Sequence, residues 1–201
     1  MEERRQWVET DAIGIFIVGG ILLGCFFPML TGYITMGAAP LVSAIIVASA
    51  VVFIILMVVE IRCGNMFGAV VNGVFGVLLG LAPGLLFLTE FIAQGMGIEV
   101  DARVVGWYFM YIAPVLIVVG FVGGYMFWHF AIAFWVLAVD VFLMGMVFAG
   151  YLSHTWNPTL GWVIGVGGIY FFYMATASFL NGMMHRKVLP LGGGLFKAGG
   201  H

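Results

Sequence analysis

Charged residues are scarce in this chain, and their scarcity excludes most soluble functions. They make up 8% of its 201 residues, whereas soluble domains carry about 25%. Seven basic and nine acidic side chains are too few to cover a water-soluble surface. The composition therefore excludes a soluble enzyme, a nucleic-acid-binding protein and a disordered chain. A transmembrane β-barrel is excluded as well, because its strands alternate apolar and polar residues and the apolar runs here are continuous.

Cysteines and catalytic motifs are also sparse. The chain has two cysteines, Cys25 inside the first apolar run and Cys63 in a short loop, and their different depths predict no disulfide. No HExxH, GxSxG or DxD pattern and no Cys/His cluster occurs in the sequence. We therefore expect neither enzymatic activity nor a bound metal or cofactor. The net charge of −2 indicates no nucleic-acid partner.

Long apolar runs are the feature that the chain does have. Hydrophobic residues make up 64% of it, and a spanning helix needs about 20 residues. The runs predict an all-α polytopic membrane protein in which residues 1–201 form one transmembrane domain of six helices. The predicted spans are residues 12–31, 39–59, 66–90, 104–123, 127–152 and 159–181. Pro28, Pro83 and Pro114 lie inside spans, where each removes a backbone hydrogen bond and predicts a bend.

The basic residues predict the orientation of this bundle. With six spans, both tails and the 2–3 and 4–5 loops share one side of the membrane. Only Arg103 falls on the other side. The shared side holds Arg4, Arg5, Arg62, Arg186, Lys187 and Lys197. Because basic loops stay in the cytoplasm, the bias predicts a multi-pass protein of the inner or plasma membrane with both termini cytoplasmic.

Glycine is abundant and regularly spaced. The chain has 30 glycines, about twice the usual frequency. Small residues recur every four positions from Gly64 to Gly84, and GxxxG pairs begin at Gly20, Gly120 and Gly161. This spacing lets helix backbones approach closely in a bilayer. It fits packing within one protomer and also a subunit interface, and the sequence leaves both open.

Asp140 is the one ionisable side chain deep inside a predicted span. An ionised carboxylate at that depth is costly and usually faces a pore or a partner. No basic residue lies at a comparable depth to pair with it. Two roles stay open, a proton-titrating or pathway group and a protonated or hydrogen-bonded structural aspartate.

A few further polar residues mark a candidate solute path. Asn65 and Asn72 lie seven residues apart on one face of the third span, and Phe75 follows one turn later. Asn65 fits either a helix N-cap or a path residue, whereas Asn72 is better placed to line a path. Asp11 sits at the start of the first span, where an N-cap is its default role.

Two segments carry a family resemblance. The turn Glu60-Ile61-Arg62-Cys63-Gly64-Asn65-Met66-Phe67-Gly68 has the pattern E-x-x-x-G-N-x-F-G. Asn181 and then Val188-Leu189-Pro190-Leu191-Gly192 follow near the end of the chain. These residues resemble the helix 2–3 turn and the V-L-P tail of acetate uptake transporters, also called succinate–acetate/proton symporters. The resemblance covers nearly the whole chain and implies structural roles for Glu60, Gly64, Phe67, Gly68 and Asn181.

The resemblance breaks at the positions associated with the solute path. The family signature N-P-A-P-L-G-L falls on residues 11–17, where Asp11 replaces the asparagine and both prolines are missing. Gly20 stands in place of a family aromatic residue, and Phe53 replaces the glutamine usual in helix 2. The chain therefore resembles a divergent member with a retained scaffold and altered selectivity elements.

The resemblance implies a protomer that assembles into a homo-hexamer in the lipid bilayer. Each protomer would have its own pore for acetate and other small monocarboxylates, sometimes succinate, with proton symport or channel-like conduction. Phe75 then contributes to the narrow point of the pore, and the Asn65 position carries over directly. The predicted solute-path residues are Asn65, Asn72, Phe75, Asp140, Asp11 and Gly20.

Two alternatives to acetate transport stay open. The predicted spans contain no deep basic residue that would attract an anion, and Asp11 would repel one at the mouth of the path. These features favour a channel for a small neutral or cationic solute, such as ammonia, urea or a protonated acid. The third possibility is a non-transporting membrane scaffold subunit, whose interior would be closed by aromatic side chains.

Overall fold

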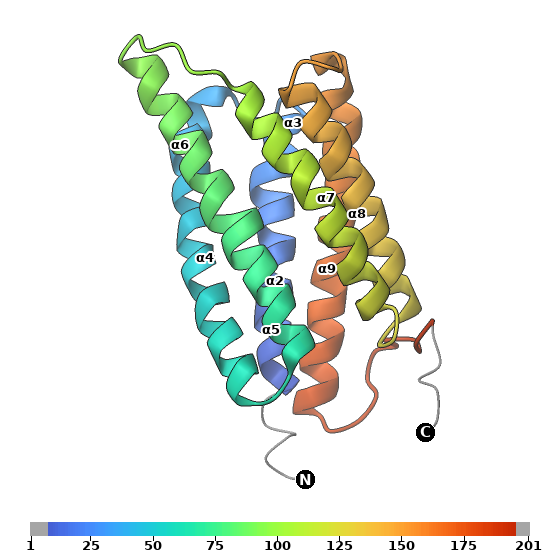
Figure 1. Ribbon diagram of the computed structural model, residues 1–201. Coiled ribbons are helices and arrows are strands. Elements are labelled where there is room, and N and C mark those ends of the chain that lie inside the picture. Colours follow the sequence, from blue (N-terminus) through green and yellow to red (C-terminus); the bar gives the residue numbers. More distant parts are fainter. Residues whose placement is uncertain (1–7, 196–201) are drawn as a thin grey trace.

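A computed structural model describes residues 8–195, apart from the side chains of residues 8–11 and 36. All regular structure in this part of the chain is helical (Figure 1). In chain order the elements are α2 (Val8–Ile21), η1 (Leu22–Phe26), α3 (Phe27–Leu30), η2 (Met36–Ala38), α4 (Ala39–Arg62), α5 (Met66–Gly73), η3 (Val74–Leu81), α6 (Ala82–Gly95), α7 (Arg103–Gly123), α8 (Trp128–Phe148), η4 (His154–Trp156) and α9 (Asn157–Met183).

Six helical segments of the described chain are long and apolar enough to cross a membrane. They are Ala12–Leu30, Ala39–Arg62, Met66–Gly95, Arg103–Gly123, Trp128–Phe148 and His154–Met183. Large apolar side chains cover the outside of the bundle; Leu41 is 71% exposed and Val166 is 65% exposed. Such a surface is costly in water and suits a lipid environment. The predicted all-α, six-span class is confirmed, and the chain is a multi-pass membrane protein.

Several spans end away from the limits of the apolar runs. α4 continues to Arg62 and α6 to Gly95, beyond the predicted ends at 59 and 90, while α8 stops at Phe148 instead of 152. After α4, Gly64 has a φ of +73°. Its N–H donates a hydrogen bond to the Ile61 carbonyl at 3.1 Å. The next N–H, that of Asn65, donates to the Glu60 carbonyl at 2.9 Å. This is a Schellman motif, which needs a left-handed residue. α4 therefore ends where Gly64 permits the turn, and not at the last apolar residue of the run.

Two of the internal prolines follow widened helical turns. The π-helical segment η1 precedes Pro28, and the π-helical segment η3 precedes Pro83. Proline has no N–H, and its ring clashes with the carbonyl four residues earlier, so a wider turn accommodates it. Pro114 lies inside α7, which the structure describes as one uninterrupted α-helix. Phe75 therefore sits on a widened turn and not on a regular helix.

The six spans surround a common interior. Around the bundle, α2 contacts α4, α4 contacts the α5–η3–α6 span, α5 contacts α7, α7 pairs with α8, and α9 lies between α8 and α2. We call one end the tail end, where the α4–α5 turn, the α7–α8 turn and residues 184–195 lie (Figure 1). The opposite end holds residues 31–38, 96–102 and 149–156.

Glycines bring neighbouring helices into close contact. A Cβ atom on Gly145 of α8 would lie 2.7 Å from the carbonyl oxygen of Gly106 in α7. The predicted GxxxG pair at Gly161 and Gly165 packs against α3 of the same chain. At Gly20, by contrast, an added Cβ would meet no atom within 4 Å. Packing within the protomer therefore explains the α9 pair, whereas Gly20 faces outward.

We expect Gly145→Ala to destabilise the bundle by about 1–3 kcal/mol, because the new methyl group overpacks the contact between α7 and α8. Gly167→Ala on α9 is the matched control, since a Cβ atom at that position meets nothing within 4 Å. Thermal unfolding of both variants in detergent measures the difference. Equal melting temperatures would show that the α7–α8 contact does not need a glycine at position 145.

Candidate functional site

A cavity inside the bundle lies toward the tail end. This tail-side cavity has a volume of about 360 Å³, and its walls come from α2, α4, α5, η3, α8, α9 and the segment after α9. None of the described residues that line it is charged, and its polar side chains are Asn72, Ser178 and Asn181. The lining residues are Gly14, Ile15, Val18, Phe53, Phe67, Gly68, Val71, Asn72, Phe75, Met126, Phe127, Phe130, Phe134, Phe171, Met174, Ser178, Asn181, Gly182 and Leu191.

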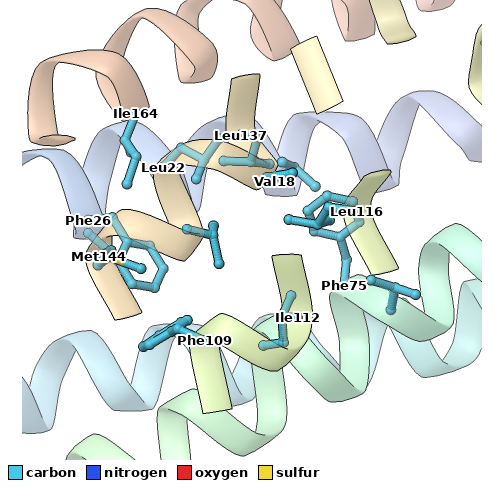
Figure 2. Packing of buried hydrophobic residues seen from close by; sticks show 14 of the residues in the cluster. Val18, Leu22, Phe26, Phe75, Phe109, Ile112, Leu116, Leu137, Met144 and Ile164 are labelled. Carbon is cyan, nitrogen blue, oxygen red and sulfur yellow. The ribbon is translucent and has the colours of Figure 1, made fainter. Parts of the chain in front are cut away.

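A smaller space lies deeper in the bundle. This inner cavity has a volume of about 40 Å³ and is lined only by apolar side chains, so it has room for about two or three water molecules. Figure 2 shows Val18, Leu22, Phe26 and Met144 gathered around this central region from different helices. The lining residues are Val18, Ile21, Leu22, Phe26, Phe53, Phe75, Leu79, Phe109, Leu137, Val141, Met144 and Ile164.

Val18, Phe53 and Phe75 line both cavities and therefore separate them. The Phe53 and Phe75 rings stack with centroids 6.1 Å apart. Phe134 meets Phe75 edge-on at 5.9 Å, in the geometry that aromatic pairs prefer. We call this contact the inner narrow point. The structure thus places Phe75 between the two cavities, and Phe53 lies beside it.

A second aromatic cluster closes the interior toward the opposite end. The Phe87 ring lies 6.4 Å from the rings of both Phe26 and Phe109. Phe109 in turn stacks on Phe148 at 5.8 Å. Aromatic side chains therefore block the bundle interior at two levels, one on each side of the inner cavity.

Asn72 is one of the polar side chains that line the tail-side cavity, and it lies three residues before Phe75 of the inner narrow point. It is 5% exposed and makes no hydrogen bond to any described residue. Gly14 of α2 makes room for it, because a Cβ at that position would lie 2.8 Å from the Asn72 Oδ1. The amide is therefore buried by the protein and faces the cavity.

Asn65 has a structural partner instead. It is the N-cap of α5, and its Oδ1 accepts a hydrogen bond from the Gly68 N–H at 3.0 Å. A Cβ on Gly68 would lie 3.0 Å from Oε2 of the buried Glu60. Asn65 is absent from the lining of both interior cavities. Of its two predicted roles, the geometry favours the cap, which joins α4 to α5.

Asn181 holds the segment after α9 against the tail end. Its Nδ2 donates to the Leu189 carbonyl at 2.8 Å, and its Oδ1 accepts from the N–H groups of Val188 and Leu189 at 2.6 and 2.9 Å. His129 lies 2.6 Å from both the Tyr170 hydroxyl and the Leu191 carbonyl. Leu191 thereby becomes part of the cavity wall, and both polar atoms of the Asn181 amide have backbone partners.

Asp140 lies apart from both interior cavities. It lines a groove between α8 and α9 together with Trp135, Trp156 and apolar residues. The side chain is 3% exposed, and its Oδ2 has no hydrogen-bond partner in the described chain. None of the residues around this groove lines either interior cavity. The position favours the structural alternative for Asp140 over a pathway role.

Two predictions at the first span do not match the geometry. Gly20 is exposed on the outside of the bundle and lines neither interior cavity, because the helical period turns it away from Val18. Asp11 is not an N-cap, because α2 already begins at Val8; its side chain lies outside the described part. The residues of α2 that do reach the interior are Gly14, Ile15 and Val18. Their three- and four-residue spacing is the signal that could have identified them.

Comparison with known proteins places this geometry in a known architecture. The fold is similar to that of the bacterial acetate channel SatP, with a TM-score of 0.71 and 18% sequence identity over 92% of this chain and 98% of that chain. No protein-family model and no curated protein matches the sequence. At this level of identity the similarity establishes the fold. The chain is thus a six-span membrane protein with the fold of an acetate channel.

Proposed function

We propose that this chain conducts a small, acetate-like monocarboxylate across a membrane through the interior of each protomer. The observation that carries the proposal is the pair of cavities that meet at Val18, Phe53 and Phe75, in a fold similar to that of an acetate channel. The apolar walls suit a methyl group, and Asn72 offers hydrogen bonds to a carboxyl group. Aromatic constrictions of this kind gate by excluding water, and the proposal includes both channel-like and proton-coupled conduction.

The proposal also includes the membrane orientation and the assembly. Arg62, Arg186 and Lys187 lie at the tail end and Arg103 at the opposite end, which supports cytoplasmic termini. Arg4, Arg5 and Lys197 lie outside the described residues. The outward face of the first span at Gly20 of α2 and Gly24 of η1, where an added Cβ meets nothing within 4 Å, is available for contact between protomers in a homo-hexamer.

A channel for a small neutral solute is the second candidate. One observation favours it, because no described residue that lines either cavity carries a charge. An ionised solute would lose its water there without gaining a counter-charge.

Uptake of labelled acetate into liposomes that contain the purified protein tests the proposal. We expect uptake above that of protein-free vesicles of the same lipid. Flux of urea or ammonia without acetate flux would instead favour the neutral-solute channel. No flux of any small solute would favour a membrane scaffold.

Phe75→Ala should widen the inner narrow point and raise the flux of butyrate relative to acetate. Removing the ring also removes its stacking on Phe53 and its contact with Phe134. Phe142→Ala is the matched control, because Phe142 is 43% exposed on the outside of α8. The measurement is the ratio of butyrate to acetate uptake at equal protein content. A ratio that stays at the wild-type value would remove Phe75 from the constriction.

Asp140→Asn should leave the pH profile of acetate flux unchanged, because the side chain lies outside both interior cavities. The same variant should raise the melting temperature by a few degrees at alkaline pH, since an amide avoids the cost of a buried, unpartnered carboxylate. Asp101→Asn, which removes an exposed carboxylate at the opposite end, is the control. A flattened pH profile in Asp140→Asn would restore a titrating role in transport.

A further inference from the structure

The buried amide of Asn72 has no partner in the described chain, and this points to a ligand. A buried amide without hydrogen bonds is costly, and most such groups in folded proteins are satisfied. Asn72 is 95% buried, because its exposed fraction is 5%, and it lines the tail-side cavity. A solute in that cavity is therefore the group that can satisfy the amide.

The surroundings of Asn72 supply no competing side chain for its amide. Gly14 faces it without a side chain. Asn181, the other amide in the cavity wall, is already bonded to Val188 and Leu189. The nearby titratable side chains Glu60 and His129 are absent from the cavity lining. At Asn72 the solute therefore meets an amide donor and an amide acceptor side by side; elsewhere the wall adds the Ser178 hydroxyl, and no described lining residue is charged.

This arrangement matches an undissociated carboxylic acid better than a carboxylate. The acid offers a carbonyl acceptor and a hydroxyl donor next to each other, so it can form two hydrogen bonds with a carboxamide at once. A carboxylate only accepts, so it would place a charged oxygen opposite the Asn72 Oδ1. It would also lie in an apolar cavity without a counter-charge, which is costly.

We propose that Asn72 is a specificity-determining residue that binds the undissociated acid form of a short-chain monocarboxylate, with its alkyl group against Phe53 and Phe75. This inference rests on the proposed function. The acid takes up its proton in water before it enters and releases it after it leaves. One proton then crosses with each acid molecule, and no side chain of the protein needs to titrate during transport.

Two probes of fixed charge test the inference in liposomes that contain the full chain. Acetamide is always neutral and carries the same donor and acceptor pair as acetic acid, whereas methanesulfonate is always anionic. We expect the wild-type protein to conduct acetamide and to exclude methanesulfonate. Asn72→Leu should lower the protein-dependent acetamide flux by about tenfold, because it removes two hydrogen bonds. Asn72→Gln, which keeps the amide, should retain a larger share of the flux.

Asn157→Leu at the start of α9 is the matched control, because it removes an amide far from the cavity, and it should conduct acetamide like the wild type. The melting temperature of each variant shows whether it is folded. Methanesulfonate flux comparable to acetate flux would overturn the inference, while the proposed monocarboxylate transport would stand. Wild-type acetamide flux in folded Asn72→Leu would overturn it as well. Acetamide flux that depends on Asn72 without any acetate flux would support the amide site and contradict the proposed function.

Discussion

The bilayer core has no water to bond backbone groups, and the rest of this structure depends on that constraint. Each span satisfies its backbone N–H and C=O groups within its own helix. The helical hydrogen-bond pattern widens into π turns before Pro28 and Pro83. Burial of apolar side chains gives little driving force between helices in lipid, so the spans associate through close shape complementarity. Contacts such as Gly106 with Gly145 hold neighbouring helices together at the edge of the bundle.

The interior of the bundle is filled by aromatic side chains and not by close glycine contacts. Phenylalanine rings from all six spans meet there, and their edge-on and stacked packing leaves two cavities with a narrow point between them. Rings and one free amide provide almost no electrostatic compensation for a solute that leaves water. Under the proposed function, such an interior would favour solutes that are small and neutral, or that become neutral by taking up a proton.

The two segments that resemble acetate uptake transporters form the scaffold of the tail end. The E-x-x-x-G-N-x-F-G turn ends α4 with Gly64 and begins α5 with the Asn65 cap. The V-L-P segment is held by Asn181. In both segments the asparagine side chain forms hydrogen bonds with backbone groups. The residues that line the two interior cavities, Phe53 and Asn72 among them, lie outside these backbone contacts, so the scaffold can persist while the cavity walls change.

Sequence alone determined the class of this protein, because a chain with only 8% charged residues and six long apolar runs has no stable place except a membrane. It also predicted Asn72 and Phe75 as path residues, and both line the tail-side cavity, while their part in transport stays a prediction. The roles of Asn65, Asp140 and Gly20 needed the tertiary structure. Whether a side chain faces a cavity, a neighbouring turn or lipid depends on how helices rotate and pack, and local sequence does not contain that information.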